Sequence, residues 1–450
     1  PNSTQSHQLN IQHSNSTNVP RYDRLQDKKV FPGIGNTLRW ATWYYGPQTR
    51  WLASYEWNSS QSKIADEIRI VAGYQDIKES RQQREYLAYT RFDSRREHIR
   101  VASFNWDAKE KWNDQELIIG VDGQFNFLKS VADRTNLLTR VVTPLDSRYP
   151  NGDNQMHLVG VYGQHLAKLK KGKLILNDGL RFQLTNLRST IADNSFFQFP
   201  FTSIRQNTRS ITGNIGLVLM PSDELRISTN FSSGFRAPNI DDGARIFESS
   251  TALARLVVPN PDIKPEYTYN GDLQMQYQMG AIRLEVTGFY TLFRNAIILA
   301  PFQLNGQDSV LYNGIKAQVI ANQNARKAFV RGFQYKSVVT LNQNLTWETT
   351  VSQTYGRFIT NNGIKKPLDH VPPLFGRSSI LYQKDALDWE FFVHFNGWKR
   401  IKDYTRDGED NAQYATPDGT PAWYTLNLRV GYQLDKSLQL QAGIENMLDR

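Results

Sequence analysis

The sequence predicts an all-β protein, a large antiparallel β-barrel that crosses a membrane. Three observations lead to this fold class. Apolar and polar residues alternate in one stretch after another, which is the pattern of strands with one apolar and one wet face. The connections between these stretches are alternately short and long, as in transmembrane barrels. Aromatic residues, 12% of the 450-residue chain, gather near strand ends, where their rings suit a membrane interface.

The clearest strand pair lies between Glu266 and Tyr290. Its first half places Tyr, Leu and Met on one face and Thr, Asn, Asp and Gln on the other. The same alternation resumes after Gly280-Ala281. A glycine in so short a connection predicts a hairpin. Both arms are longer than the usual soluble strand of about 5–6 residues.

The same hairpin repeats along the chain. We expect short turns around 59–66, 109–110, 170–172, 221–222, 280–281, 343–344, 385–386 and 435–436. The long connections are expected at approximately 17–47, 80–95, 128–155, 187–204, 236–265, 297–327, 358–372 and 401–421. Counting from His7 gives about seventeen strands, with boundaries uncertain by a few residues. No Gly/Ser linker divides the chain, so residues 1–450 are expected to form one domain.

A soluble all-β protein, such as a propeller or several sandwiches, predicts the same alternation. A soluble fold of this kind has no reason to keep every second connection short. The sequence also shows no propeller-like repeat of about 40–50 residues. The strands also meet or exceed the roughly 9–11 residues of a tilted membrane strand. We therefore expect apolar faces toward lipid and polar faces around a water-filled interior. The lipid-facing set includes Val286, Leu438, Leu440 and Ile444.

The direction of the strands predicts more chain at both ends. If the short turns are periplasmic, the strand at 225–231 runs outward, and so does the last one at 438–444. A closed barrel with an even number of strands then needs one strand after Arg450 and an even number before His7. Neither a signal peptide nor an initiator Met is present. We interpret the chain as a partial barrel from a longer protein.

Several motifs resemble one family. They are FSSGFRAPN at 231–239, PNPDIKPEYTYNGDL at 259–273, PLDHVPPLFG at 367–376 and AGIENMLDR at 442–450. In this order they resemble the barrel signature of TonB-dependent outer-membrane receptors. NVPRYDRL at 18–25 and TWYYGPQ at 42–48 are similar to receptors of this family from the Bacteroidetes.

The resemblance implies a 22-stranded barrel in the bacterial outer membrane, closed by an N-terminal plug that is not in this sequence. Four strands before the chain and one after it would complete the count. It also implies TonB-dependent import of a scarce nutrient, and a ferric chelate such as a siderophore or haem is the expected cargo. Cobalamin, another metal or a glycan are alternatives, as is a passive porin or export channel.

The implied partners are outer-membrane lipid and lipopolysaccharide, the TonB complex through the missing N-terminal part, a small nutrient and a surface lipoprotein. The net charge of +10 suits lipopolysaccharide phosphates or an anionic ligand but is a weak cue. Lys168 to Lys173, KLKKGK, reads as a solvated turn, so we expect no nucleic acid.

No catalytic or metal site is predicted. The chain has no cysteine, its seven histidines show no ligand spacing, and no nucleophile arrangement appears. We expect no cofactor and no enzyme. The acidic runs Asp241-Asp242 and Asp407 to Asp410 are expected to be solvated. Haem receptors that resemble the 231–273 region carry a histidine between its two boxes, and residues 239–258 contain none.

Ligand contacts are expected in the loops at 128–155, 236–265 and 297–327 and near the end of 358–372. The candidates are Tyr149, Arg236, Tyr312 and His370. For the proline-rich boxes around Arg236, loop architecture is the favoured explanation, because prolines stiffen a long connection.

Overall fold

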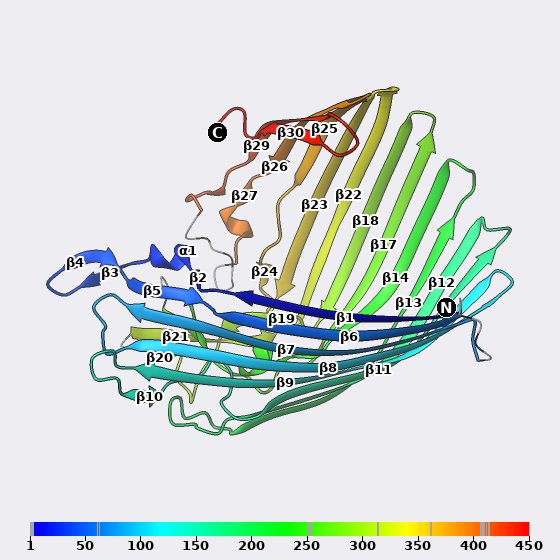
Figure 1. The fold of residues 1–450 in the computed structure, drawn as a ribbon. Helices are drawn as coiled ribbons and strands as arrows, with labels where there is room; N and C mark the ends of the chain where they lie inside the picture. The colour runs from blue at the N-terminus through cyan, green and yellow to red at the C-terminus, as the bar shows by residue number, and fades with distance from the viewer. Residues whose placement is uncertain are drawn as a thin grey trace.

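The computed structural model describes residues 4–60, 62, 64–250, 254–312, 315–360, 362–405, 410, 412 and 415–449, with the backbone alone for 247–250. Its main element is one curved antiparallel sheet. Figure 1 shows the strands side by side around a wide interior, with β1 (Gln5–Ser16) at one margin and β30 (Gln439–Ile444) at the other.

Seventeen strands form the wall, each paired with its neighbours in chain order. Between β1 and β30 they are β6 (Gln48–Ser60), β7 (Glu67–Glu85), β8 (Phe92–Trp112), β9 (Gln115–Thr135), β11 (Asn154–Leu169), β12 (Leu174–Thr190), β13 (Ser203–Leu219), β14 (Leu225–Arg236), β17 (Glu266–Met279), β18 (Ile282–Arg294), β22 (Lys327–Asn342), β23 (Leu345–Ile359), β25 (Phe375–Lys384), β26 (Leu387–Asn396) and β29 (Trp423–Gln433). The predicted barrel wall of about seventeen strands is confirmed.

The long connections contain shorter elements. Four strands lengthen the main sheet to 21 strands: β2 (Val19–Pro20), β5 (Trp40–Tyr45), β10 (Val142–Pro144) and β24 (Lys365–Pro367). The others are α1 (Tyr22–Leu25), β3 (Lys28–Phe31), β4 (Gly35–Leu38), α2 (Ile240–Ala244), β15 (Phe247–Ser250), β16 (Arg255–Val257), β19 (Ile297–Pro301), β20 (Ser309–Tyr312), β21 (Ile315–Asn324), β27 (Lys399–Arg400), η1 (Ile401–Asp403) and β28 (Gly419–Thr420).

Short turns and long loops alternate largely as predicted, with two differences. The connection expected at 80–95 spans only 86–91, because β7 continues to Glu85 and β8 begins at Phe92. The turn at 280–281 lies in its expected place between β17 and β18. The turn between β8 and β9 lies at 113–114 rather than 109–110, because β8 continues to Trp112. Asn113 has φ 51°, a left-handed conformation that asparagine tolerates better than most residues.

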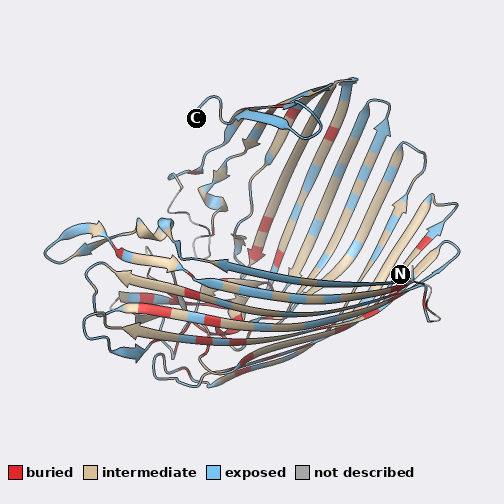
Figure 2. Cartoon of the chain, in the orientation of Figure 1, coloured by how far each residue is buried: buried red, intermediate tan, exposed pale blue. Residues whose placement is uncertain are grey.

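The apolar faces of the strands point outward. The four side chains expected to face lipid are exposed rather than packed in a core: Val286 (46%), Leu438 (49%), Leu440 (55%) and Ile444 (57%). Figure 2 shows buried residues as short segments on strands that are otherwise intermediate or exposed. The wall therefore has an apolar outer face, as the alternation predicted.

The inner face is polar and crossed by ion pairs. Two of these pairs link neighbouring strands, Arg377 with Glu390 at 2.8 Å and Lys336 with Glu348 at 2.9 Å. A third, Arg181 with Asp122 at 2.6 Å, reaches from β12 to β9 across β11. Each ion pair holds two charged side chains in one position inside the hydrated interior, where they would otherwise move freely.

One aromatic residue departs from this polar lining. Phe392 is only 1% exposed although it lies on the inner face of β26. The guanidinium groups of Arg377 and Arg429 lie 4.3 and 5.1 Å from its ring centroid, and His394 packs against its edge. Cation–π contacts on its face allow the ring to sit among charged groups.

The two margins of the wall pair on one side only within the described residues. β1 pairs with β6, and β30 pairs with β29. Closure by further strands stays a prediction, as does the division into domains. In the part of the chain that the structure describes, no helix is long and apolar enough to span a membrane.

Candidate ligand-binding vestibule

Three long connections fold together into one compact unit, which we call the loop cap and define as residues 191–202, 237–265 and 295–326. Their apolar side chains share one buried cluster: Phe199, Ile246, Leu256, Val258, Leu304, Ala317, Val319 and Ala321. A small sheet of β15, β16, β21 and β19, with β20 paired to β21, belongs to it. In this sheet β16 and β21 run parallel.

The loop cap is fastened to the inner face of the barrel wall. Ile240 and Ala244 of α2 lie in one buried cluster with Leu128, Leu187 and Ile204. These last three come from β9, β12 and β13, on the faces that alternate with the lipid-facing residues. The loop cap therefore fills part of the barrel mouth and forms one side of a vestibule.

The segment that begins with the FRAPN motif is shaped by charge at the start of α2. Asn239 and Asp242 form a reciprocal capping box, in which each side chain accepts from the other's backbone N–H. Arg236 donates to both carboxylate oxygens of Asp242 at 2.6 and 2.7 Å. The guanidinium of Arg236 is thus engaged in the architecture of the loop.

Asparagine side chains hold the PNPDIKPE segment against β21. The Asn260 amide donates to the Asn322 carbonyl at 2.8 Å. Asn322 in turn donates to the Asp242 carbonyl at 3.0 Å. Asn324 accepts from the Lys264 N–H at 2.7 Å and donates to the Lys264 carbonyl at 2.9 Å. These bonds satisfy backbone groups that would otherwise be orphaned, which supports a structural role for this motif.

Tyr149 joins the β9–β11 connection to α2. Its hydroxyl donates to Asp241 at 2.9 Å and accepts from Arg148 Nε at 3.2 Å. Asp241 also pairs with Arg245 at 2.8 Å. Burial raises the pKa of the Tyr149 hydroxyl above its ordinary value, because the phenolate form is disfavoured away from water. Tyr149 therefore stays a neutral donor at physiological pH.

Tyr312 makes a second tie between the loop cap and the wall. Its hydroxyl donates to Asp146 Oδ2 at 3.0 Å. The same carboxylate pairs with Arg95 of β8 at 2.8 Å, and Arg95 Nε donates to the Asp146 carbonyl at 3.1 Å. Both Arg95 and Asp146 are largely buried, so this charged pair is screened little by solvent.

The structure thus brings three of the four candidate residues into one assembly and leaves His370 outside it. His370 lies in the connection between β23 and β25, where its backbone N–H donates to Asp410 at 3.0 Å. The Asp410 side chain is only 4% exposed and also pairs with Lys399 at 3.1 Å. The expectation that this acidic run is solvated is wrong for Asp410, and residues 407–409 lie outside the described part.

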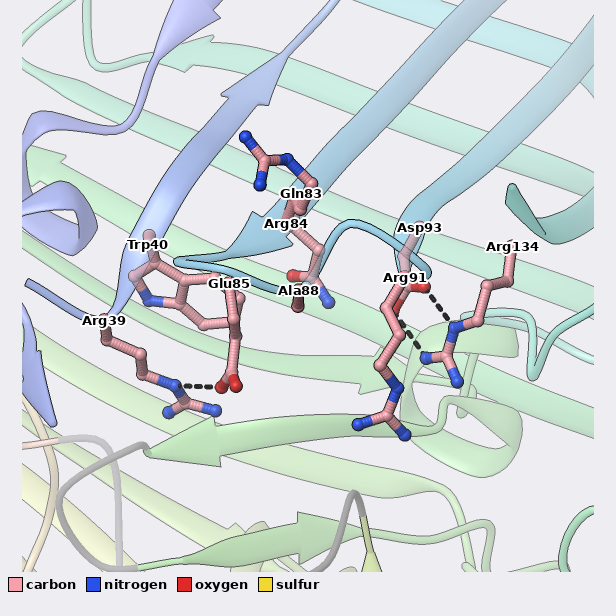
Figure 3. A pocket seen from close by; sticks show the side chains of 9 residues that line it. All are labelled: Arg39, Trp40, Gln83, Arg84, Glu85, Ala88, Arg91, Asp93 and Arg134. Carbon is pink, nitrogen blue, oxygen red and sulfur yellow. Dashed lines mark hydrogen bonds and ion pairs between the residues drawn. The ribbon is translucent and has the colours of Figure 1, made fainter. Parts of the chain in front are cut away.

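A small basic pocket opens at the loop ends of β5, β7, β8 and β9 (Figure 3). It encloses about 40 Å³ and is lined by four arginines, two acids and three other residues: Arg39, Trp40, Gln83, Arg84, Glu85, Ala88, Arg91, Asp93 and Arg134. Two of the arginines are paired, Arg39 with Glu85 at 2.7 Å and Arg134 with Asp93 at 2.6 Å.

The remaining charges leave this pocket positive. Arg91 is exposed and makes no ion pair with a carboxylate among the described residues. Figure 3 shows its side chain beside the Asp93–Arg134 pair. The Arg84 guanidinium lies 5.1 Å from the Tyr89 ring centroid. A guanidinium next to a volume of this size can take up a carboxylate or phosphate group through paired N–H donors.

Sequence reasoning missed this pocket and most of the ion pairs. Arg39 and Arg134 are 95 positions apart and line one pocket only because β5, β7, β8 and β9 lie side by side. Single charged residues in long polar loops carry no signal of a partner. Among the described residues, no group of three or more His, Asp or Glu is placed to hold a metal ion. Ligand contact by Tyr149, Arg236, Tyr312 and His370 stays a prediction.

Residues 2–447 match the family model described as "TonB dependent receptor-like, beta-barrel". The "Probable TonB-dependent siderophore receptor PirA" of Acinetobacter baumannii is 20% identical over 313 residues, which are 64% of this chain and 41% of that protein. "Hemoglobin-haptoglobin utilization protein B" of Neisseria meningitidis is 23% identical over 243 residues, 50% of this chain and 30% of that protein.

The fold is also similar to solved structures. "Copper transporter OprC" superposes with a TM-score of 0.76 at 14% identity, covering 100% of this chain and 64% of that one. At this identity the likeness shows the fold alone. The chain thus spans well under half of the curated relatives named above and about two thirds of this structural neighbour.

Proposed function

Because the chain belongs to the TonB dependent receptor-like β-barrel family, we propose that it forms the wall and vestibule of a receptor that imports a ferric chelate. The family places the chain in the bacterial outer membrane. The family match across residues 2–447 is the single observation that carries this proposal. The polar inner face supports it, because a hydrated passage needs a polar wall.

The names of the relatives favour iron compounds as cargo. One is named for a siderophore and another for haemoglobin and haptoglobin. A siderophore complex or haem therefore ranks before cobalamin, another metal or a glycan. A Bacteroidetes origin stays a prediction.

The basic pocket favours a chelate with anionic groups. Arg91 supplies an unpaired guanidinium at the vestibule wall, and the paired Arg134 and Arg39 flank it. Carboxylate or phosphate groups on a chelate would gain charge-assisted hydrogen bonds there. Transport would use energy delivered by TonB through a plug encoded outside this sequence. A surface lipoprotein that hands over the chelate is a further proposed partner.

Growth on defined iron sources tests the proposal. A strain lacking the gene should fail to grow on one ferric chelate or haem as sole iron source, and the wild-type gene should restore growth. If the deletion strain grew as well as wild type on every iron source, iron import would be ruled out as the function. Uptake that continues without TonB would instead favour a passive channel.

Variants of the basic pocket, expressed in the same deletion strain, test whether Arg91 contacts the chelate. Arg91→Gln should lower uptake of the chelate by about tenfold, the loss of one charge-assisted contact. Arg140→Gln is the matched control, because Arg140 is an exposed arginine of the neighbouring loop outside the pocket. Equal uptake by both variants would show that Arg91 does not contact the chelate, whatever the cargo.

A further inference from the structure

A short buried segment joins the barrel wall to the loop cap. It consists of residues 145–150, and we call it the strap. Four of its six residues are buried. On the wall side, the Leu145 N–H donates to the Ala132 carbonyl of β9 at 3.2 Å. On the other side, the Arg148 carbonyl accepts from the Ile246 N–H of the loop cap at 2.8 Å. The loop cap is thus held to the wall in part through the strap.

A buried acid, Glu97 of β8, lies beneath the strap. Its side chain is only 1% exposed. Ser130 of β9 connects it to the strap, because its hydroxyl donates to Glu97 Oε1 at 3.4 Å and accepts from the Tyr149 N–H at 3.4 Å. Ile99, two residues away on the same face of β8, packs against the cluster that holds α2. Release of the strap and the loop cap would therefore expose the Glu97 carboxylate to water.

This part of β8 stands beyond the lipid-facing band of the wall. The outward side chains on either side of Glu97 belong to Arg96 and His98. The Arg96 side chain is 52% exposed and ion-paired with Asp133 of β9. Apolar outward residues such as Phe104, which is 39% exposed, lie nearer the tight turn. Charged groups are costly on a lipid-facing surface, so Glu97 belongs to the vestibule, where water surrounds the wall.

Glu97 shares its cation with a second carboxylate. Arg81 of β7 pairs with Glu97 at 2.9 Å and with Glu79 at 2.6 Å. Among the residues that the structure describes, Glu97 makes no other ion pair. Two carboxylates on one guanidinium leave a negative charge unbalanced where little water reaches it. Such an arrangement disfavours the ionised form of the more deeply buried carboxyl.

The remaining cations near Glu97 are engaged with other carboxylates. The titratable and charged groups that face Glu97 from the elements around it are Arg81 and Glu79 of β7, Arg95 of β8, and Asp146, Arg148 and Tyr149 of the strap. Arg95 pairs with Asp146 at 2.8 Å, and Arg148 lies 3.6 Å from Asp241 of α2. Both arginines therefore balance the Glu97 carboxylate only weakly.

The buried site favours the protonated form of Glu97. Burial raises the pKa of this carboxyl above its ordinary value, Arg81 opposes the rise, and Glu79 adds to it. The contribution of burial lasts only while the strap covers the side chain, so the docked arrangement binds the proton more tightly than the released one. By linkage, docking is most stable below the ordinary carboxyl pKa and loses stability as the pH rises toward the raised value.

We propose that Glu97 is a proton-controlled latch for the vestibule. When the buried carboxylate takes up a proton from water, the unbalanced charge beneath the strap disappears, and the strap and loop cap stay docked on the wall. When the carboxyl loses this proton, the charge draws water in and the loop cap opens more often. The vestibule is therefore tighter in mildly acidic surroundings than at neutral pH. The latch concerns the loops of the vestibule and holds whichever nutrient is imported.

Amide hydrogen exchange of residues 240–244 tests the latch, in the full-length receptor purified from outer membranes in detergent. The readout is the protection factor, the intrinsic exchange rate divided by the measured rate, because this ratio removes the pH dependence of the exchange chemistry itself. As the pH rises from about 5 to about 8, the protection factor should fall by up to about tenfold per pH unit, the limit for one proton, and then level off.

Three variants separate Glu97 from its neighbours. Glu97→Gln imitates the protonated carboxyl and should keep the protection factor high and constant across this range. Glu79→Gln removes the like charge and should move the fall to lower pH, whereas Arg81→Gln removes the cation and should move it to higher pH. Glu224→Gln is the matched control and should follow wild type, because Glu224 is exposed in a tight turn at the opposite end of the barrel.

Three results would overturn the proposal. A wild-type protection factor that stays constant over this pH range would show that no proton controls docking. A pH dependence in Glu97→Gln equal to that of wild type would assign the proton to another group. Low protection in Glu97→Gln at every pH would mean that the charged carboxylate is needed as a partner of Arg81. If Glu97→Gln does not reach the outer membrane, a Glu79→Gln profile identical to wild type contradicts the latch.

Discussion

At the scale of single residues, the vestibule is held together by polar side chains that reach across long loops. Tyr149 and Tyr312 each donate to a carboxylate from another connection. Asn260 and Asn324 bond backbone groups that no strand ladder satisfies. Such bonds add about 0.5–1.5 kcal/mol each when made, and more is lost when a buried partner is left alone. These residues position the loops on which ligand contacts depend.

Removing one hydroxyl should loosen α2. Tyr149→Phe deletes the donor to Asp241 and the acceptor of Arg148, so the opening free energy of α2 should fall by about 1–2 kcal/mol. Amide hydrogen exchange of residues 240–244 measures this change. Tyr22→Phe is the control, since Tyr22 is 70% exposed. Unchanged exchange in Tyr149→Phe would mean that the apolar contacts of α2 suffice.

At the scale of elements, the loop cap behaves as a small folded unit attached to the wall. Its core is contributed by three separate connections, and β16 and β21 pair in parallel although the paired residues, such as Arg255 and Gln318, are 63 positions apart. Parallel pairing needs a crossover connection rather than a hairpin. A core of this kind makes the three connections move together rather than as independent loops.

A cavity in this core should release the loop cap without unfolding the wall. Leu256 is fully buried, and Leu256→Ala should destabilise the loop cap by about 2–5 kcal/mol. Limited proteolysis should then cut within 237–265 faster, while the strands stay protected. Leu311→Ala is the matched control, because Leu311 belongs to the same unit but is 78% exposed. Equal cleavage of both variants would contradict a shared core.

At the scale of the whole molecule, the two faces of one sheet meet two different solvents. Outward side chains such as Leu180 and Ile211 are 69% and 71% exposed, which in a membrane means contact with lipid. Inward side chains form ion pairs such as Arg181 with Asp122. The same strand therefore tolerates charge at one position and rejects it at the next.

Adjacent positions on β17 should show this difference. Leu273 is 51% exposed midway along the strand. Leu273→Arg should destabilise the barrel in a bilayer by about 2–4 kcal/mol. Gln274 lines a cavity on the inner face, so Gln274→Arg should cost less than about 1 kcal/mol. Equilibrium unfolding in lipid vesicles compares them. An equal loss in both would contradict the assignment of faces.

Much of the wall was predictable from the sequence because strand alternation is local. A residue such as Val286 reveals its face through neighbours two positions away, and a turn such as Gly280-Ala281 is visible as a break in the alternation. The displaced turn at 113–114 shows the limit, since a polar strand end and a turn look alike in sequence. The motifs between 231 and 273 pointed to the family that the match at residues 2–447 shows.

The sequence alone determined the barrel, its strand count, its apolar outer face and its family, because each depends on contacts between residues close in the chain or on motifs read in order. Only the tertiary structure decided how the vestibule is built. Tyr149 and Asp241 are 92 positions apart, and Tyr312 and Asp146 are 166 apart. Partners at such separations leave no periodic signal, since they meet only after the wall has brought the ends of its strands together.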